Sequence, residues 1–153
     1  MKISSISCST ARIYLSGMNP SVAERTPTIL FFEDEPESIS SLKTIIQSSL
    51  APAVQINTVS SIAKALTVMR EENPSLIIAN LELSGAFDLL EAVRHSPVPV
   101  LLTIHEYPES LAAVRFLQWE YLIKPFHSTL VSRKVQEVWL KPADQMEIRF
   151  DMN

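Results

Sequence analysis

The chain has 153 residues, a formal net charge of −4 and a pI near 5.4, so it lacks the basic field that nucleic acid or anionic lipid would require. None of its apolar runs approaches the roughly 18 residues of a membrane span. Its single cysteine, Cys8, excludes an internal disulfide and a multi-cysteine metal site, and it fits a reducing cytoplasm, which is the predicted location.

The N-terminal segment differs in composition from the rest of the chain. It is rich in serine and holds no acidic residue before Glu24, which loosely suits an organelle transit peptide but lacks the apolar core of a secretory signal. A disordered leader, or a true start at Met18, is the favoured interpretation. The predicted organisation is a leader over residues 1–25, one domain over 26–142 and a C-terminal tail over 143–153.

Within the domain, short apolar runs alternate with segments of helical periodicity. The predicted strands are 28–32, 54–59, 76–79, 98–102 and 120–123. The predicted helices, in chain order, run from Pro36 to before Pro52, from Ser60 or Ser61 to Asn73-Pro74, over Phe87, Leu90 and Val93, from Pro108 through Leu111 and Val114 to Leu117, and over Val131, Val135, Val138 and Trp139 to Lys141-Pro142.

Strand and helix alternate five times, which predicts an α/β fold. We expect a three-layer α/β/α doubly wound (βα)5 domain of the flavodoxin-like type, with a parallel sheet in the order 2-1-3-4-5. Only two glycines occur, so some loop positions that usually take glycine must hold bulkier residues. In this strand order the first, third, fourth and fifth strands are neighbours, and their carboxyl ends line one pocket.

Polar residues stand at those four strand ends. They are Glu33-Asp34-Glu35, Asn80, Thr103 and Lys124-Pro125. We therefore expect carboxylates, an amide, a hydroxyl and an ammonium to meet in one place, with Asn80 at its centre. Each feature alone has a simpler alternative, because acids favour helix starts, Lys-Pro suits a loop and Tyr121 suits core or edge packing. The histidines His95, His105 and His127 have no ligand spacing, so surface or capping roles are favoured for them.

Four motifs, in order and in register, resemble those of response-regulator receiver domains. They are the acidic opening Ile29 to Pro36, the phosphoacceptor strand Pro74 to Leu83, the switch-threonine strand Pro99 to Thr103, and the tyrosine and lysine-proline motif Tyr121 to Phe126. The resemblance covers residues 27 to about 140. It implies the CheY-like fold and a role in two-component signal transduction.

In that family the residue at position 80 is an aspartate that takes a phosphoryl group from a histidine kinase, with magnesium bound by neighbouring acids. Asn80 cannot do this, because an amide oxygen is a poor neutral nucleophile. The resemblance thus implies a degenerate phosphoacceptor position and no required cofactor. At most, a weak magnesium site is implied, made of Glu33, Asp34, Asn80 and Glu82.

The resemblance also assigns switch and pocket roles to Thr103, Tyr121 and Lys124. Two departures from the family pattern suggest a pocket that is no longer kept open for a kinase. Ile104 stands where a small residue is usual and could narrow the approach, and residues 116–119 replace a small, glycine-containing turn.

These observations predict a stand-alone pseudo-receiver that signals by protein–protein contact and is not an enzyme. The expected partner is a signalling protein or a histidine kinase-related protein, or a second copy of the chain, bound at the face of the fourth helix, fifth strand and fifth helix. That face carries Arg115, Phe116, Trp119 and Trp139. One alternative is a single-domain phosphorelay response regulator whose aspartate was replaced by Asn80. Another is a flavodoxin-like small-ligand binder, disfavoured because no glycine-rich loop follows the first strand.

Overall fold

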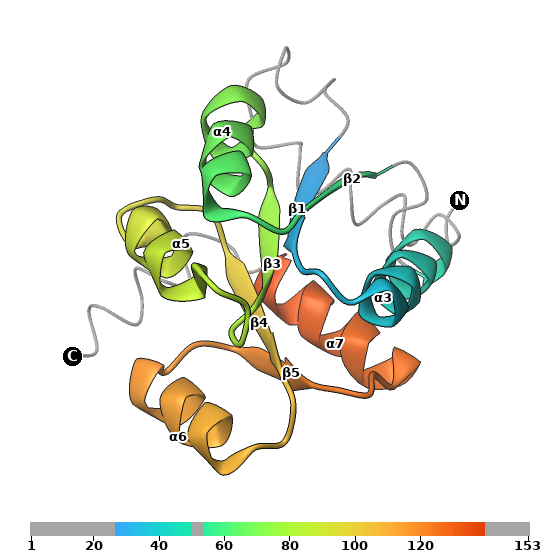
Figure 1. Cartoon of the computed structure of the whole chain (residues 1–153). Coiled ribbons are helices and arrows are strands. Elements are labelled where there is room, and N and C mark those ends of the chain that lie inside the picture. The colour runs from blue at the N-terminus through green and yellow to red at the C-terminus, as the bar shows by residue number, and fades with distance from the viewer. Residues whose placement is uncertain (1–26, 50–53, 140–153) are drawn as a thin grey trace, which may run out of the picture.

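The fold is built on a parallel sheet of five strands in the order β2-β1-β3-β4-β5, with helices on both faces (Figure 1). The computed structural model describes residues 27–49 and 54–139. The predicted leader, 1–25, and tail, 143–153, lie outside these residues. The predicted doubly wound α/β architecture and its strand order are confirmed.

The elements alternate strictly along the chain. The strands are β1 (Thr28–Phe32), β2 (Gln55–Val59), β3 (Leu76–Asn80), β4 (Val100–Ile104) and β5 (Tyr121–Ile123). The helices are α3 (Pro36–Ser49), α4 (Ile62–Glu72), α5 (Ala86–Val93), α6 (Pro108–Leu117) and α7 (Ser128–Trp139). Across the described ranges, no helix is long and apolar enough to cross a membrane.

The three central strands are buried along their whole length, as expected for strands covered on both faces. Their side chains alternate between two apolar clusters. One cluster joins the sheet to α3 and α7 and includes Phe31, Leu42 and Val135. The other joins it to α4, α5 and α6 and includes Phe32 and Leu89. Burial of each large apolar side chain stabilises the fold by roughly 1.5–3 kcal/mol.

Two details of the sequence prediction are wrong. The fourth strand begins at Val100 rather than at residue 98, because Pro99 has no N–H to donate to the sheet; only its carbonyl bonds to β3. Phe87 does not belong to the buried face of α5. It is 58% exposed, whereas Ala86, Leu89, Leu90 and Val93 are buried.

The helix ends follow the expected local chemistry. Ser61 caps α4 by accepting a backbone N–H from the first turn. With so few glycines, the left-handed positions that close α4 and α6 are taken by Asn73 and Gln118, at φ 47° and 59°. Gly85 stands before α5 at φ 91°, where a Cβ would lie 3.0 Å from that of Ile62. That position therefore requires glycine.

Candidate functional site

The predicted site residues converge at the carboxyl ends of the central strands. Asn80, the last residue of β3, is the register partner of Thr103 in β4, so the two side chains emerge on the same face of the sheet. Glu33 directly follows β1, and its backbone N–H donates a hydrogen bond to the carbonyl of Val59 at 3.0 Å. Lys124 follows β5 and donates its N–H to the carbonyl of Ile104 at 2.8 Å.

Both ends of the Asn80 amide are engaged. Its Nδ2 donates to Oε1 of Glu33 at 2.9 Å, and its Oδ1 accepts the backbone N–H of Glu82 at 2.9 Å. Oε1 of Glu33 also accepts the N–H groups of Asp34 and Glu35, at 3.0 and 3.3 Å. Asn80 is 5% exposed and Glu33 is 2% exposed. The amide is therefore a fixed bridge between the β1 and β3 loops rather than a group facing solvent.

The buried ammonium of Lys124 lies between two carboxylates. Its Nζ is 2.9 Å from Oε2 of Glu33 and 2.7 Å from Oε1 of Glu35. The contact with Glu33 is an ion pair at short distance without hydrogen-bond alignment. The hydrogen bond from Lys124 lowers the pKa of Glu35 below its usual value, and a further hydrogen bond from Ser38 acts in the same direction. The positive charge of Lys124 is thus neutralised within the site.

A second cluster lies beside the first and holds Glu82. His105 contacts Glu82 through Nδ1 and Oε1 at 2.7 Å and through its backbone N–H at 2.8 Å, and Ser110 donates to Oε2 at 2.6 Å. Partial burial alone would raise the pKa of Glu82, but the hydrogen bonds from Ser110 and His105 outweigh it and lower the pKa. Nε2 of His105 is 3.6 Å from Oε2 of Glu35. His105 therefore links the two clusters.

The remaining predicted pocket residues differ in their surroundings. Thr103 is 1% exposed, and its hydroxyl makes no hydrogen bond within the described part of the chain. Tyr121 is half-buried against the cluster of α4, α5 and α6. Asp34 is exposed, and among the residues that the structure describes only its backbone N–H is engaged. Ile104 is fully buried in the same cluster as Tyr121, so the core accommodates its bulk.

The residues that the resemblance implies for magnesium do not converge on one point. The Glu82 carboxylate turns toward His105 and Ser110, and the Glu33 carboxylate is occupied by Asn80 and Lys124. Among residues 27–49 and 54–139, no group of three or more Asp, Glu, His or Cys side chains is arranged to hold a metal ion. In this arrangement the donor set does not fit a hard divalent cation, which prefers several carboxylate oxygens.

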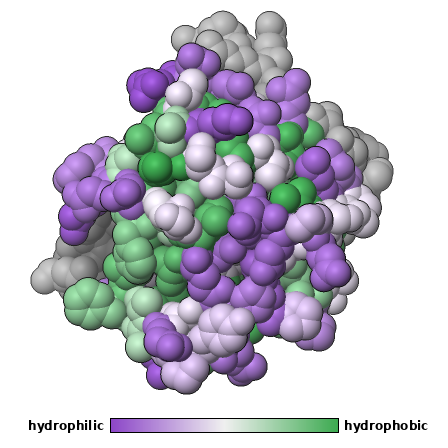
Figure 2. All heavy atoms as spheres, viewed as in Figure 1, coloured by the Kyte–Doolittle hydropathy of each residue, from purple (hydrophilic) through white to green (hydrophobic). Residues whose placement is uncertain are grey.

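The predicted partner face is presented only in part. Arg115 is exposed on α6, and Phe116 is 86% exposed. Trp119 is half-buried against the core. Trp139 is 8% exposed and packs in the cluster with α3 and α7, so it is not available on the surface. Hydrophobic side chains gather along one side of the molecule, over α5 and α6, on the left in Figure 2.

Three functional contacts were not anticipated from the sequence: Glu35 with Lys124, His105 with Glu82, and Ser110 with Glu82. Glu35 belongs to the predicted acidic run, but its lysine partner lies 89 residues away. His105 directly follows β4, and parallel strands end at a common edge of the sheet. The sequence therefore contained a signal for the contact between His105 and Glu82.

No protein-family model and no curated protein matches the chain. Solved structures do match it. They include the N-terminal signal receiver domain of a two-component response regulator from Bacteroides fragilis, with TM-score 0.64, 17% identity, and coverage of 77% of this chain and 100% of that one. SdrG from Sphingomonas melonis Fr1 has TM-score 0.60 and 22% identity over 74% and 95% of the two chains. The response regulator PhyR from Brucella abortus has TM-score 0.66 and 15% identity over 94% and 72%.

The chain has the receiver-domain fold. At identities this low, the comparison concerns the fold and not the chemistry. The site of this receiver-fold chain must therefore be interpreted from its own residues. At position 80 it carries an amide that is hydrogen-bonded at both ends.

Proposed function

We propose that this chain is a pseudo-receiver: a signalling module of the receiver fold that acts by protein–protein contact, without phosphoryl transfer at residue 80 and without enzymatic activity of its own. The observation that supports this most directly is the environment of Asn80. Its amide nitrogen donates to Glu33 and its oxygen accepts from the Glu82 backbone. The position lacks a nucleophile, because the amide lone pair is delocalised and the oxygen is neutral.

The charges around Asn80 support the same proposal. Glu33 and Glu35 neutralise the positive charge of Lys124 directly. This ammonium therefore does not depend on an anionic phosphoryl group as a partner. Such a module holds one resting arrangement unless a ligand binds another state better. Its output is then a docking surface, and exposed Phe116 with neighbouring Arg115 supplies the residue types favoured at interfaces.

One observation favours a second candidate, a response regulator whose aspartate was replaced by Asn80 while the rest of the pocket stayed in place. The Thr103 hydroxyl is buried without a hydrogen-bond partner in the described residues. A buried hydroxyl without a hydrogen-bond partner costs stability. Because Thr103 lies beside residue 80, its hydroxyl would be placed to contact a bound anion in a variant that carries aspartate at position 80.

Incubation with acetyl phosphate and magnesium, followed by intact-mass measurement, tests the proposal. We expect no phosphoryl adduct on the native chain, because residue 80 cannot attack phosphorus. The matched control is Asn80→Asp, which supplies a carboxylate at the same place. If that variant gains a phosphoryl adduct and the native chain does not, the pocket is competent apart from residue 80, as the second candidate requires. An adduct at or beside residue 80 of the native chain would overturn both candidates.

A further inference from the structure

The outer edge of β5 has unpaired backbone groups. The strand order leaves β5 paired with β4 alone. The carbonyl of Glu120 accepts a hydrogen bond from β4 at 3.0 Å, and the N–H of Lys124 donates one to β4 at 2.8 Å. Because backbone groups alternate in direction along a parallel strand, the N–H and C=O groups of Tyr121 and Ile123 point away from β4. Nothing in the described part of the chain hydrogen-bonds them.

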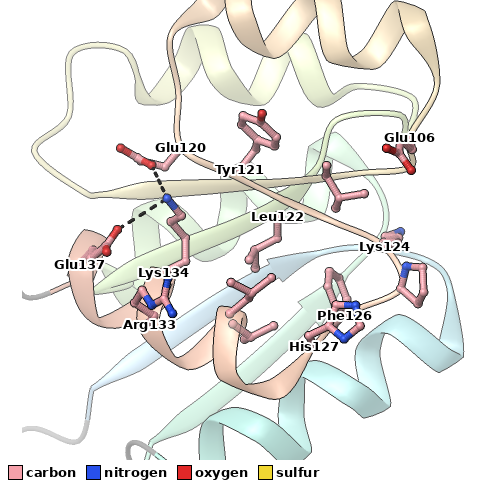
Figure 3. A pocket seen from close by; sticks show the side chains of 14 residues that line it. Glu106, Glu120, Tyr121, Leu122, Lys124, Phe126, His127, Arg133, Lys134 and Glu137 are labelled. Carbon is pink, nitrogen blue, oxygen red and sulfur yellow. Dashed lines mark hydrogen bonds and ion pairs between the residues drawn. The ribbon is translucent and has the colours of Figure 1, made fainter.

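A groove of about 580 Å³ lies along this edge, between β5 and α7 (Figure 3). Lys134 reaches Glu120 at one end of the groove, and Phe126 and His127 stand at the other. Leu130 of α7 is 49% exposed in its wall. The groove also holds charged side chains of α7, among them Arg133 and Glu137. An unpaired strand edge beside partly apolar side chains is an arrangement to which an extended segment adds as a further strand.

The chain itself contains a segment with the pattern of such a strand. Over residues 146–152, which lie outside the described residues, apolar and polar side chains alternate strictly: Met146, Ile148, Phe150 and Met152 are separated by Glu147, Arg149 and Asp151. This period of two is typical of a strand with one buried face. Placed along β5, such a strand would lay all its apolar side chains on one side, where they can cover Leu130 and Phe126.

The topology disfavours parallel addition of the segment to β5 of its own chain. Lys134 of α7 lies 2.9 Å from Glu120, just before β5, so α7 ends near the amino end of that strand. The steps from β3 to β4 and from β4 to β5 carry their helices on the α4–α6 side of the sheet, whereas α7 lies on the side of α3. A parallel strand placed beyond β5 after α7 would therefore make a left-handed crossover, which about 98% of such connections avoid.

We propose that residues 146–152 of one copy add to the β5 edge of a second copy, and that the exchange is reciprocal, giving a dimer with two-fold symmetry. The self-complementary surface is then the same groove and the same segment on each protomer. Residues 140–145 connect the end of α7 to the segment in the sequence. This inference goes beyond the proposed function and does not depend on residue 80.

The test is sedimentation velocity on the full chain over a range of concentrations, with hydrogen exchange at the amides of Tyr121 and Ile123. We expect a dimer in which both amides are protected. Phe150→Asp, on the apolar side of the segment, should raise the dimer dissociation constant at least tenfold and expose both amides. Arg149→Asp, on the polar side, is the matched control and should leave both readouts unchanged. On the groove wall, Leu130→Asp should act like Phe150→Asp, and Gln136→Asp, an exposed position on α7, should not.

Two results would overturn the proposal. The first is a chain that stays monomeric at every concentration, whether the two amides exchange freely or are protected; protection in a monomer would mean that the segment binds its own domain. The second is a dimer that survives Phe150→Asp with both amides still protected. Circular dichroism melting of each variant separates loss of pairing from loss of fold. If Leu130→Asp does not fold, the comparison of Phe150→Asp with Arg149→Asp still decides.

Discussion

The amide nitrogen of Asn80 donates a 2.9 Å hydrogen bond to the buried carboxylate of Glu33, 47 residues earlier in the chain. This contact joins the ends of β1 and β3 at the point where a receiver domain would hold its phosphoryl group. Because Glu33 is itself paired with Lys124, the amide completes a network of three buried polar side chains. A change at residue 80 is therefore expected to affect the stability of this edge of the sheet.

Replacing Asn80 with aspartate should destabilise the chain in the absence of divalent cations. The substitution turns a donor into a second carboxylate beside Glu33, so a hydrogen bond to a charged group is lost and like charges face each other. We expect the free energy of unfolding to fall by about 1 to 3 kcal/mol. Magnesium should recover part of this loss, because the added carboxylate supplies an oxygen ligand. Urea unfolding with and without magnesium measures both effects. An unchanged stability would mean that residues 80 and 33 do not share a pocket.

Removing the charge of Lys124 should be the most damaging single change in the pocket. Lys124→Met keeps much of the side-chain length but leaves Glu33, which is 2% exposed, without its cation. Loss of one partner of a buried pair costs about 3 to 5 kcal/mol. The control is Lys134→Met, whose partners Glu120 and Glu137 have side chains that are 47% and 53% exposed; that change should cost less than about 1 kcal/mol. Equal losses in chemical denaturation would argue against the buried network.

Stability should depend on pH through Glu82, whose pKa is lowered by its contacts with Ser110 and His105 against the opposing effect of burial. A glutamate with a lowered folded pKa contributes stability that is present above its unfolded value near 4.5 and is lost as pH falls through the folded pKa. Thermal unfolding from about pH 6 down to about pH 3 should show this decline, and Glu82→Gln should flatten it.

The pKa of Lys134 is shifted in the opposite direction to that of Glu82, so the same unfolding measurement extended to alkaline pH tests it. Its hydrogen bond to Glu120 raises its pKa above 10.5, so the stability from this shift is present below that pH and is lost as pH rises through the raised pKa. Lys134→Met should therefore flatten the alkaline side of the profile. A Glu82→Gln profile that matches the native one at every pH would contradict the assigned role of Glu82.

The docking surface can be tested at Phe116. Its side chain is 86% exposed, so Phe116→Ala should leave the melting temperature almost unchanged. Aromatic anchors at interfaces commonly contribute about 2 kcal/mol or more, so affinity for a partner captured from cell extract should fall roughly thirtyfold. Asp34→Ala, at an exposed position in the acidic opening, is the control and should bind normally. If Asp34→Ala abolishes binding and Phe116→Ala does not, the pocket rather than α6 is the working surface.

Much of this architecture could be predicted from the sequence. Alternation of apolar runs with helical periodicity determines the doubly wound sheet, since buried parallel strands need helices on both faces. In such a sheet all carboxyl ends lie at one edge. For that reason Glu33, Asn80, Thr103 and Lys124 could be placed at neighbouring strand ends before any coordinates were known. The identity of residue 80 also follows from the sequence alone, and with it the loss of a nucleophile.

Only the tertiary structure decided which of these groups pair. The acidic run offers three carboxylates, and their side-chain directions, which periodicity does not encode, bring Glu33 and Glu35 to Lys124 and leave Asp34 in solvent. Likewise, Glu82 faces His105 because β3 and β4 are neighbours and the loops that follow them meet. Trp139 continues the buried stripe of α7 and packs under α3 instead of reaching the surface. Each outcome depends on contacts between segments far apart in the chain, which local sequence patterns cannot specify.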